Sequence, residues 1–431
     1  MRRQLAAPVC ATMRVLWLRP GPCLPLHHGG RVYSYHLITS MADLCHLHVL
    51  EAGGDKDETL DGPGTPYGHV IERIRSDNRM PEWSPRRFFT YLWPIVRNLF
   101  ASREPLCLTL FVEKRFAQRA RELVQSRRFD VVVADGIYLA SIFEDWESER
   151  HIPAVLIQHT VESVLWRRVA EVQRNPVTWL FYHEMARRLR RREPGLCRLF
   201  DGVTAISQVD AEHMRRVYGL TNVLGVVPIG ASSIPEGVPE SVIKLPSSPI
   251  VTFVGSMNYQ PNADAAFWFI REVLPLIRQT LPEVKFRVIG RDPPRSLVQE
   301  AKVNPALEVT GTVEEVLPLL RECSTMVVPL RAGSGVRLKI MESLSAGLPI
   351  VSTSVGAEGL VLENGRDILL ADDAASFAQA VLRLLQDDAL RREMAERGMQ
   401  RVQSDFSWKQ SGARLFEMLA SVLQARAQSQ N

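Results

Sequence analysis

Short hydrophobic runs alternate with amphipathic stretches along most of the chain, and this alternation is the strongest signal in the sequence. Runs rich in Val, Ile and Leu predict buried strands, and apolar residues at helical spacing between them predict helices. The predicted strands are 14–18, 45–50, 130–135, 154–159 and 202–207, then 249–255, 285–290, 307–311, 325–330 and 349–354. Strands that alternate with helices pair in parallel, so we predict an α/β fold with doubly wound sheets.

The chain is long enough for two domains. Its 431 residues exceed the length at which one core usually stops growing, which favours two domains of about 200 residues each. Residues 232–249 are rich in Pro and Ser and lack periodicity, as a linker does. We therefore predict an N-terminal domain over 13–235, with an insertion at about 51–110, and a second domain over 248–405.

Composition and charge exclude several classes of protein. Hydrophobic residues make up 46% of the chain and charged residues 23%, which is typical of an ordered globular protein. Residues 1–12 contain an Arg pair and a short apolar stretch, but Arg14 ends that stretch too early for an export signal. No apolar run is long enough to span a membrane. The six cysteines are scattered without a CxxC pair, which favours reduced thiols in a cytosol over disulfides or zinc.

The positive charge is concentrated in the first half of the sequence. The net charge of +4 is too small to indicate nucleic-acid binding. Arginines nevertheless cluster there at 86–87, 127–128, 167–168 and 187–192. A basic face can attract anionic lipid headgroups, although a solvated helix surface is the interpretation we favour.

The loop after the strand at 325–330 has the chemistry of an anion site. Gly333 and Gly335 allow close approach of the backbone, and the helix that follows offers free N–H groups at its positive end. Arg337 and Lys339 add positive charge, as a diphosphate leaving group requires. Glu342 either interacts with the helix dipole or accepts hydrogen bonds from ribose hydroxyls. A glycine-tolerant loop with two solvated bases is the open alternative.

At this point several segments resemble one family. The segments FVGSMNYQPNADA, VIGRDPP, VTGTVEEV, VPLRAGSGVRLKIMESLSAGLPIVSTSVGAEGL and LLADD are similar to the donor-binding domain of bacterial family-four glycosyltransferases (glycosyl transferases group 1). The segments GGRVYSYHL, FDVVVAD, QHTVESVLWRR and FDGVTAIS resemble the acceptor domain of the same family more weakly. The resemblance implies the GT-B fold, with two Rossmann-like domains facing across a cleft and a C-terminal helix at 406–425 returning to the first.

The resemblance also implies roles for particular residues. Arg337 and Lys339 would face the diphosphate, Glu342 would hold the donor ribose, and His159 would lie near the reacting sugar. The remaining donor-site residues implied in this way are Gly29, Gly30, Arg31, Gly255, Ser256, Gly311, Thr312, Val313, Gly333, Ser334, Gly335 and Glu358.

Two positions depart from the family pattern. The frequent glutamate pair has only its second member, because Ser334 occupies the position of the first. Many members also have an Arg and a Lys directly after the first strand of the second domain, where this chain has 256–258 as Ser-Met-Asn. We therefore assign the phosphate contacts to Arg337 and Lys339.

Other polar residues receive a simpler interpretation. The histidines at 27, 28, 36, 46 and 48 fit no zinc spacing, so we expect no metal site. Asp55 and Asp57 lie in a Gly-rich acidic loop and are interpreted as solvated. Asp135 follows a buried strand, and we expect it to cap the next helix.

The predicted function is therefore sugar transfer. The resemblance implies a retaining transfer without a metal or other cofactor, from a nucleotide-diphosphate sugar to a glycan or lipid-linked acceptor, in cell-surface polysaccharide synthesis. We expect a cytoplasmic protein with peripheral contact at the inner face of the plasma membrane and with no nucleic-acid partner. A nucleotide-sugar epimerase on the same fold and a non-catalytic nucleotide-sugar-binding protein are the alternatives.

Overall fold

The chain divides into two compact units, which we describe separately. The computed structural model describes residues 13–24, 26, 29–53, 58–61, 65–74, 104–109, 114–126, 128–144, 146, 150–173, 175–231, 237–333 and 337–429. Unit 1 comprises Met1–Ser163, His183–Pro228 and Trp408–Asn431, and unit 2 comprises Val164–Tyr182 and Ile229–Ser407.

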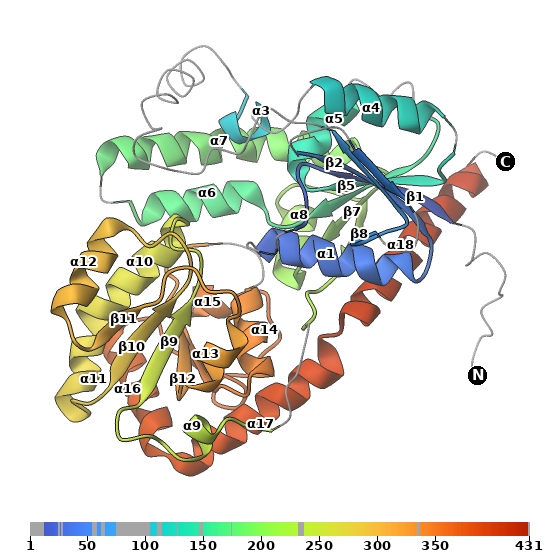
Figure 1. The fold of residues 1–431 in the computed structure, drawn as a ribbon. Coiled ribbons are helices and arrows are strands. Elements are labelled where there is room, and N and C mark those ends of the chain that lie inside the picture. The colour runs from blue at the N-terminus through green and yellow to red at the C-terminus, as the bar shows by residue number, and fades with distance from the viewer. Residues whose placement is uncertain are drawn as a thin grey trace. The chain divides into compact units, whose positions relative to one another are not determined.

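In the described part of unit 1, eight strands form one sheet in the order β3-β4-β2-β1-β5-β6-β7-β8 (Figure 1). The strands are β1 Arg14–Arg19, β2 His46–Ala52, β3 Glu58–Asp61, β4 Val70–Ile74, β5 Val131–Asp135, β6 Ala154–Gln158, β7 Gly202–Ala205 and β8 Val223–Val226. All neighbours pair in parallel except β3 and β4. Every residue of β5 and β6 is buried, which explains their nearly continuous Val, Ile and Leu content.

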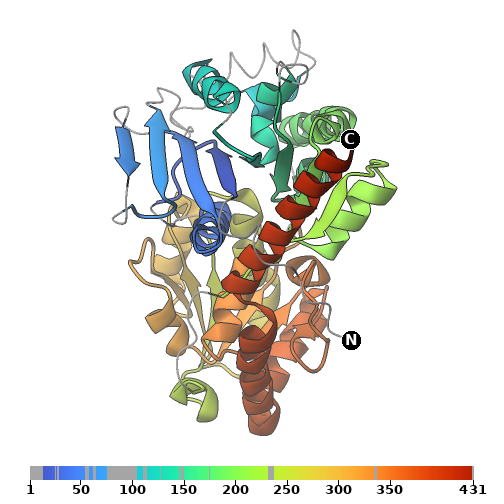
Figure 2. The same ribbon diagram turned by 90° about the vertical axis from the view of Figure 1, so that its right-hand side faces the viewer.

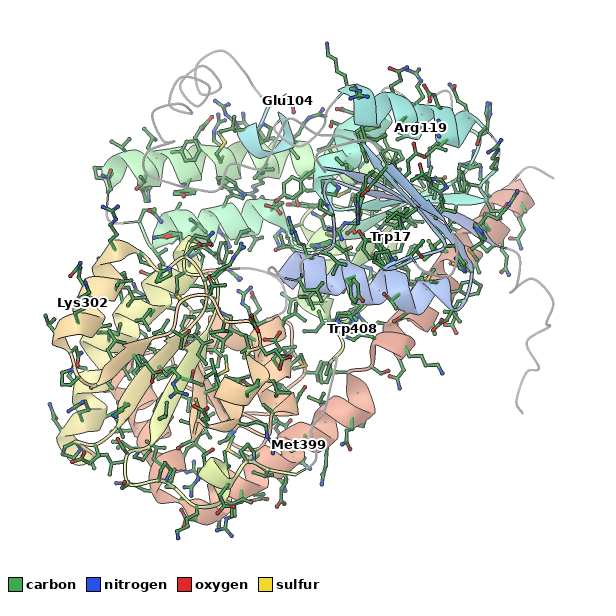
Figure 3. The ribbon with its side chains drawn as sticks, viewed as in Figure 1. Trp17, Glu104, Arg119, Lys302, Met399 and Trp408 are labelled. Carbon is green, nitrogen blue, oxygen red and sulfur yellow. The ribbon has the colours of Figure 1, made fainter. Side chains whose placement is uncertain are left out.

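The helices of unit 1 connect and cover these strands. They are α1 Gly29–Ala42, α3 Leu106–Thr109, α4 Lys114–Gln125, η1 Ile137–Leu139, α5 Ala140–Glu144, α6 Glu162–Glu171, α7 Pro176–Arg198, α8 Gln208–Arg216 and α18 Trp408–Ser429. The unit boundaries fall inside α6 and α7. Helix α18 packs on α1, where Trp408, labelled in Figure 3, stacks on His36 with ring centroids 5.0 Å apart. Ser411 Oγ of α18 also donates to Pro228 O, in the segment after β8, at 2.8 Å.

Unit 2 contains a second, all-parallel sheet in the order β11-β10-β9-β12-β13-β14. Its strands are β9 Ile250–Val254, β10 Lys285–Ile289, β11 Leu307–Val309, β12 Thr325–Val328, β13 Ile350–Ser352 and β14 Leu369–Leu370. Its helices are α9 Glu240–Ile243, α10 Gln260–Trp268, η2 Phe269–Val273, α11 Leu274–Thr280, α12 Arg295–Val303, α13 Leu317–Arg321, α14 Leu338–Ser345, α15 Ser354–Ala357, α16 Ala374–Gln386 and α17 Asp388–Asp405. The predicted α/β class with two doubly wound sheets is confirmed.

All ten predicted strands are present, and the structure adds four more in its described part. The range 51–110, predicted as an insertion, contributes β3 and β4 to the sheet, with β3 at the outer edge (Figure 2). The predicted N-terminal range 13–235 includes 164–182, which group with unit 2, and the helix predicted at 406–425 groups with unit 1. Residues 1–12 lie outside the described residues.

Candidate functional site

Three polar residues meet where the central strands of unit 1 end. Asp135 closes β5, Arg19 closes β1, and His159 directly follows β6. Asp135 is 3% exposed. Its carboxylate lies 3.5 Å from Arg19 Nε, accepts a hydrogen bond from Trp17 Nε1 at 3.1 Å and bonds to His159 Nε2. Burial alone would raise the pKa of Asp135, but the charge of Arg19 and the contact with His159 outweigh it and hold the pKa well below its usual value.

The predicted capping role of Asp135 is wrong. The N-cap of the following helical turn is Gly136, and no side chain bonds the backbone there. The Asp135 carboxylate instead contacts Arg19, Trp17 and His159, because a buried charge is stable only when it is paired and hydrogen-bonded. Asp135 is thus a buried charge that fixes His159.

The start of α1 lies beside His159. Gly29, Gly30 and Arg31 form the first turn of this helix rather than a loop. A Cβ on Gly30 would lie 3.5 Å from His159 Nδ1, and the Tyr33 ring meets the imidazole edge-on at 5.3 Å. The structure therefore brings together the predicted residues Gly30 and His159, while His27 and His28 lie outside the described residues.

A buried carboxylate that the sequence analysis did not single out holds the turn after β6. Glu193 is 0% exposed and accepts hydrogen bonds from the backbone N–H groups of Glu162 and Ser163 at 2.9 and 3.1 Å. Gln158 Nε2 and the Tyr218 hydroxyl also donate to it, at 2.7 and 2.6 Å. Burial raises the pKa of Glu193. By accepting from the first free N–H groups of α6, Glu193 fixes the turn that carries the histidine.

In unit 2, the loop after β9 and the helix after β12 meet around Lys339. Lys339 Nζ donates to Asn262 Oδ1 at 2.8 Å and lies 4.3 Å from the centroid of the Phe253 ring. Asn262 Nδ2 in turn donates to Ser256 O at 2.9 Å. A Cβ on Gly255 would lie 3.0 Å from Lys339 Nζ and 2.7 Å from Asn262 Nδ2. Glycine at 255 therefore leaves the space that the ammonium group occupies.

Arg337 and Gly333 flank the same helix. Arg337 is the N-cap of α14, and its guanidinium packs so closely on Gly333 that any Cβ there would collide with Nη2. Gly333 also has φ 135°, a conformation that residues with a Cβ rarely adopt. The remaining predicted loop residues, Ser334 and Gly335, lie outside the described residues.

The two cations influence one another. Burial and the nearby charge of Arg337 lower the pKa of Lys339 well below the usual lysine value, with Glu342 opposing them. Glu342 is exposed on α14, three residues beyond Lys339. An anion bound beside Lys339 would favour the protonated form of its side chain and so oppose this lowering of the pKa.

Glu358 has a partner that the sequence analysis did not identify. Arg168, in the part of α6 that belongs to unit 2, donates to both carboxylate oxygens of Glu358, with Nη2 2.7 Å from Oε1. The same guanidinium donates to the carbonyl oxygen of Gly333 at 2.8 Å. Arg168 therefore joins the residue after α15 to the loop that leads to α14.

The predicted base-binding residues lie farther along the sheet edge. Gly311, Thr312 and Val313 follow β11, which is two strands from β9 in the sheet order. That separation corresponds to about 10 Å. Gly311 has φ 70° and open space where a Cβ would be.

The described residues contain no group of three or more His, Cys, Asp or Glu side chains placed to hold a metal ion. Among them, no helix combines the length and the apolar character needed to cross a membrane. His46 instead stacks on His69, and His48 Nε2 lies 3.4 Å from Glu72 Oε2.

Comparison with known proteins identifies the chain. Residues 248–387 match the family described as Glycosyl transferases group 1, and residues 28–232 match Glycosyltransferase Family 4. A 44.6 kDa protein in the cps region of Klebsiella pneumoniae is 21% identical over 91% of this chain and 96% of its own length. LpsE of Rhizobium meliloti, a lipopolysaccharide core biosynthesis glycosyltransferase, is 27% identical over 33% of this chain and 43% of its own length.

Solved structures show the same architecture. Sucrose-phosphate synthase from Thermosynechococcus elongatus superposes with a TM-score of 0.67 at 17% identity, over 96% of this chain and all of that one. HepE from Anabaena, solved in complex with UDP, gives 0.62 at 13% identity over 95% of this chain and 100% of its own. The chain is therefore a family 4 glycosyltransferase built on the GT-B fold.

Proposed function

We propose that this glycosyltransferase moves a sugar from a nucleoside-diphosphate sugar to a hydroxyl of a glycan or lipid-linked acceptor, with retention of configuration and without a metal ion. The observation that carries the proposal is the pair of cations at the start of α14. Arg337 and Lys339 lie beside two glycines, Gly333 and Gly255, whose missing Cβ atoms leave the space that the two cationic groups occupy.

Charge development during the reaction explains why this arrangement suits a diphosphate. The bond between the anomeric carbon and the diphosphate oxygen breaks, and negative charge builds on the departing oxygen. Fixed cations and the N-terminal end of α14 stabilise that charge more than they stabilise the bound donor. The acceptor oxygen bonds to the same face of the anomeric carbon, and its proton leaves to the diphosphate.

Other predicted residues take complementary roles in this proposal. Glu342, exposed on α14, accepts hydrogen bonds from the donor ribose, and Gly311–Val313 approach the base. His159 faces the reacting sugar through Nδ1, because Asp135 occupies Nε2. Glu358 lines the donor site and is held in place by Arg168.

The relatives support the chemical class of the substrates. HepE has been solved with UDP and with UDP-glucose, which favours a nucleoside-diphosphate sugar as the donor. LpsE is named for lipopolysaccharide core biosynthesis, which favours a surface polysaccharide as the product.

The test is a transfer assay with purified full-length protein in the presence of EDTA. A panel of UDP-, GDP- and ADP-sugars is incubated with oligosaccharide and lipid-linked acceptors, and the anomeric configuration of the glycoside is read by NMR. Arg337→Ala and Lys339→Ala should lower turnover by about 100-fold, the loss seen when one transition-state donor is removed, with little change in folding stability. Lys302→Ala, at an exposed lysine on α12, is the matched control (Figure 3). Full activity in both site variants would refute the role of the two cations. A requirement for a metal ion would refute metal independence, and an inverted product would refute retention of configuration.

The proposal includes peripheral contact with an anionic membrane at the inner face of the plasma membrane. Its support is an exposed apolar turn at the start of α7, where Val177, Trp179 and Leu180 are 74%, 43% and 61% exposed. Arg190 and Arg191 are exposed farther along the same helix. Exposed aromatic and aliphatic residues insert into the headgroup region of a bilayer, and arginines elsewhere on the same helix attract its anionic lipids. Leu180→Glu should abolish co-sedimentation with phosphatidylglycerol vesicles, and binding equal to that of the unaltered protein would contradict the assignment.

A further inference from the structure

The described part of unit 1 contains a cavity of about 440 Å³ beside the outer strands of its sheet. Strands β3 and β4 supply part of its lining, and helix α4 supplies the rest. Sites for small ligands in proteins have volumes of about 300–1,000 Å³, so the cavity is large enough to be one.

The charged groups that line the cavity balance one another. They are three arginines and three glutamates: Arg73, Arg115, Arg119, Glu58, Glu72 and Glu122. Arg119 (Figure 3) donates from Nε to Glu72 Oε1 at 2.5 Å and from Nη1 to Glu122 Oε2 at 3.1 Å. Arg73 Nη1 donates to Glu58 Oε1 at 2.5 Å. A lining without net charge does not attract a phosphate, and a polar lining does not suit a lipid chain, so the cavity favours a neutral ligand rich in hydroxyl groups.

The lining can both donate hydrogen bonds to sugar hydroxyls and accept from them. Gln118 Nε2 donates to Glu122 Oε1 at 3.2 Å, and the Glu122 side chain is 49% exposed. A carboxamide has a second N–H and an acceptor oxygen, and each carboxylate oxygen has two lone pairs. Thr59 adds an exposed hydroxyl from β3. Groups that already hold one another lose little side-chain entropy when a ligand binds.

A row of polar contacts inside unit 1 connects this cavity with His159. Glu51 accepts from Arg73 and is 0% exposed, and Asp135, which contacts His159, is 3% exposed. Hydrogen-bonded networks in a buried setting are rigid, so the row fixes the spacing between the cavity and the histidine. In order along the sheet edge, the row consists of Arg73, Glu51, Tyr67, Cys23, Arg19, Asp135 and His159.

The cavity and His159 lie at the same edge of the sheet. Arg73 and Ile74 end β4, His159 directly follows β6, and the strands from β4 to β6 are parallel. Three strands separate β4 from β6 in the sheet order, which corresponds to about 19 Å between their ends. That distance is longer than a disaccharide, so a glycan that reaches both places is an oligosaccharide.

We propose that the cavity is a distal acceptor subsite, which binds a neutral sugar residue of an oligosaccharide whose reacting hydroxyl lies at His159. This inference rests on the proposed function, because it specifies the length and the charge of the acceptor in the same reaction.

The dependence of transfer on acceptor length tests the subsite. Full-length protein is given the donor that it uses, together with free and lipid-linked oligosaccharides of one to six sugars, both neutral and anionic, and kcat/KM is measured for each. Among neutral acceptors, kcat/KM should be about 10- to 100-fold higher for the hexasaccharide than for the disaccharide, as expected for one or two net hydrogen bonds in the subsite.

Three variants connect this length advantage with the cavity. Thr59→Trp fills the cavity from an exposed position of an edge strand, where an aromatic residue is tolerated, and should reduce the hexasaccharide-to-disaccharide ratio to within about twofold of one. Gln118→Ala removes one hydrogen-bonding group and should lower the ratio by about 3- to 10-fold. Gln125→Ala, at the exposed end of the same helix and outside the lining, is the matched control and should keep the ratio of the unaltered protein. Because the ratio compares two acceptors with one protein preparation, a partly unfolded fraction does not change it.

The outcomes distinguish this inference from the proposed function. A kcat/KM that does not rise with acceptor length, a length advantage that survives in Thr59→Trp, or an advantage confined to anionic acceptors would overturn the inference alone. An unaltered protein that transfers sugar to none of these acceptors from any donor would overturn the proposed function and the inference with it.

Discussion

Replacing Asp135 with Asn tests the buried charge cluster of unit 1. The substitution keeps the shape of the side chain and an oxygen that accepts from Trp17 Nε1. It removes the negative charge that lies 3.5 Å from Arg19 Nε. At an effective dielectric constant of about 20, two charges at that separation attract by about 5 kcal/mol. Because Arg19 stays buried without this partner, we expect a loss of about 3–5 kcal/mol in stability.

Asp130→Asn is the matched control. Asp130 precedes β5, and its carboxylate lies 3.1 Å from Arg14 Nη2 in a pair that is 34% and 50% exposed. An exposed pair contributes about 0–1 kcal/mol and is screened by salt. The control should therefore change stability little, and its effect should vanish in about 0.5 M salt, whereas the effect of Asp135→Asn should persist.

Hydrogen exchange of the β5 and β6 amides measures the stability of unit 1 alone. A single unfolding transition of the whole chain would instead combine the stabilities of both units. The slowest amides should exchange at least about 100-fold faster in Asp135→Asn. The folded-state pKa of Asp135 lies below its unfolded value, so the carboxylate stabilises the fold above about pH 4. The difference in stability between Asp135→Asn and the unaltered protein should be constant from about pH 5 to pH 8 and should shrink below about pH 4. Exchange rates within about fivefold of each other at neutral pH would refute the reasoning, since that ratio corresponds to about 1 kcal/mol.

Three further predictions concern unit 2. A double-mutant cycle on Arg168→Ala and Glu358→Ala should give a coupling energy of about 1 kcal/mol, and strictly additive effects in urea unfolding would show that their contact is not stabilising. Gly290→Ala should lower the free energy of unfolding by about 3 kcal/mol or more. Gly365 has φ 83° and open space where a Cβ would be, so Gly365→Ala should lower it by about 1–2 kcal/mol. Similar unfolding midpoints for the two variants would contradict the close approach of the loops. Because the pKa of Lys339 is lowered, its charge is lost at lower pH than in an ordinary lysine, so diphosphate affinity should begin to fall below the pH at which an ordinary lysine loses its charge, and Lys339→Arg should flatten that profile.

Strand prediction succeeded where burial on both faces leaves a continuous apolar run. Strands β5 and β9 are of this kind, because helices cover both faces of a parallel sheet. Strand β3 could not be recognised, since its sequence Glu-Thr-Leu-Asp is polar and it pairs only with β4 at the edge. Strand β4 contains Glu72 and Arg73, whose ion pairs with distant residues replace apolar packing. Strand β14 has two residues, which is too short for any periodicity.

The candidate site was predictable where position after a strand and residue type agree. Gly333, Arg337 and Lys339 combine glycine freedom with positive charge in one loop, so they are recognisable from sequence. Asp135 was assigned the wrong role because its partner Arg19 is far away in sequence and β1 and β5 become neighbours only in the sheet. Glu193 was overlooked because it lies within an Arg-rich helix, where a carboxylate normally faces solvent.

The absence of basic residues at 256–258 is therefore weak evidence against phosphate binding. Strands β9 and β10 are parallel neighbours, so their carboxyl ends lie about 4.8 Å apart at one edge of the sheet. An arginine side chain is longer than that distance, and a cation after either strand can reach the same anion. Arg291 Nε donates to Ser256 Oγ at 2.7 Å, so a side chain that follows β10 reaches the loop that follows β9. If Arg337→Ala and Lys339→Ala each weaken diphosphate binding and the double variant abolishes it, the two cations bind one anion; if either single variant keeps the affinity of the unaltered protein, that side chain does not contact the diphosphate.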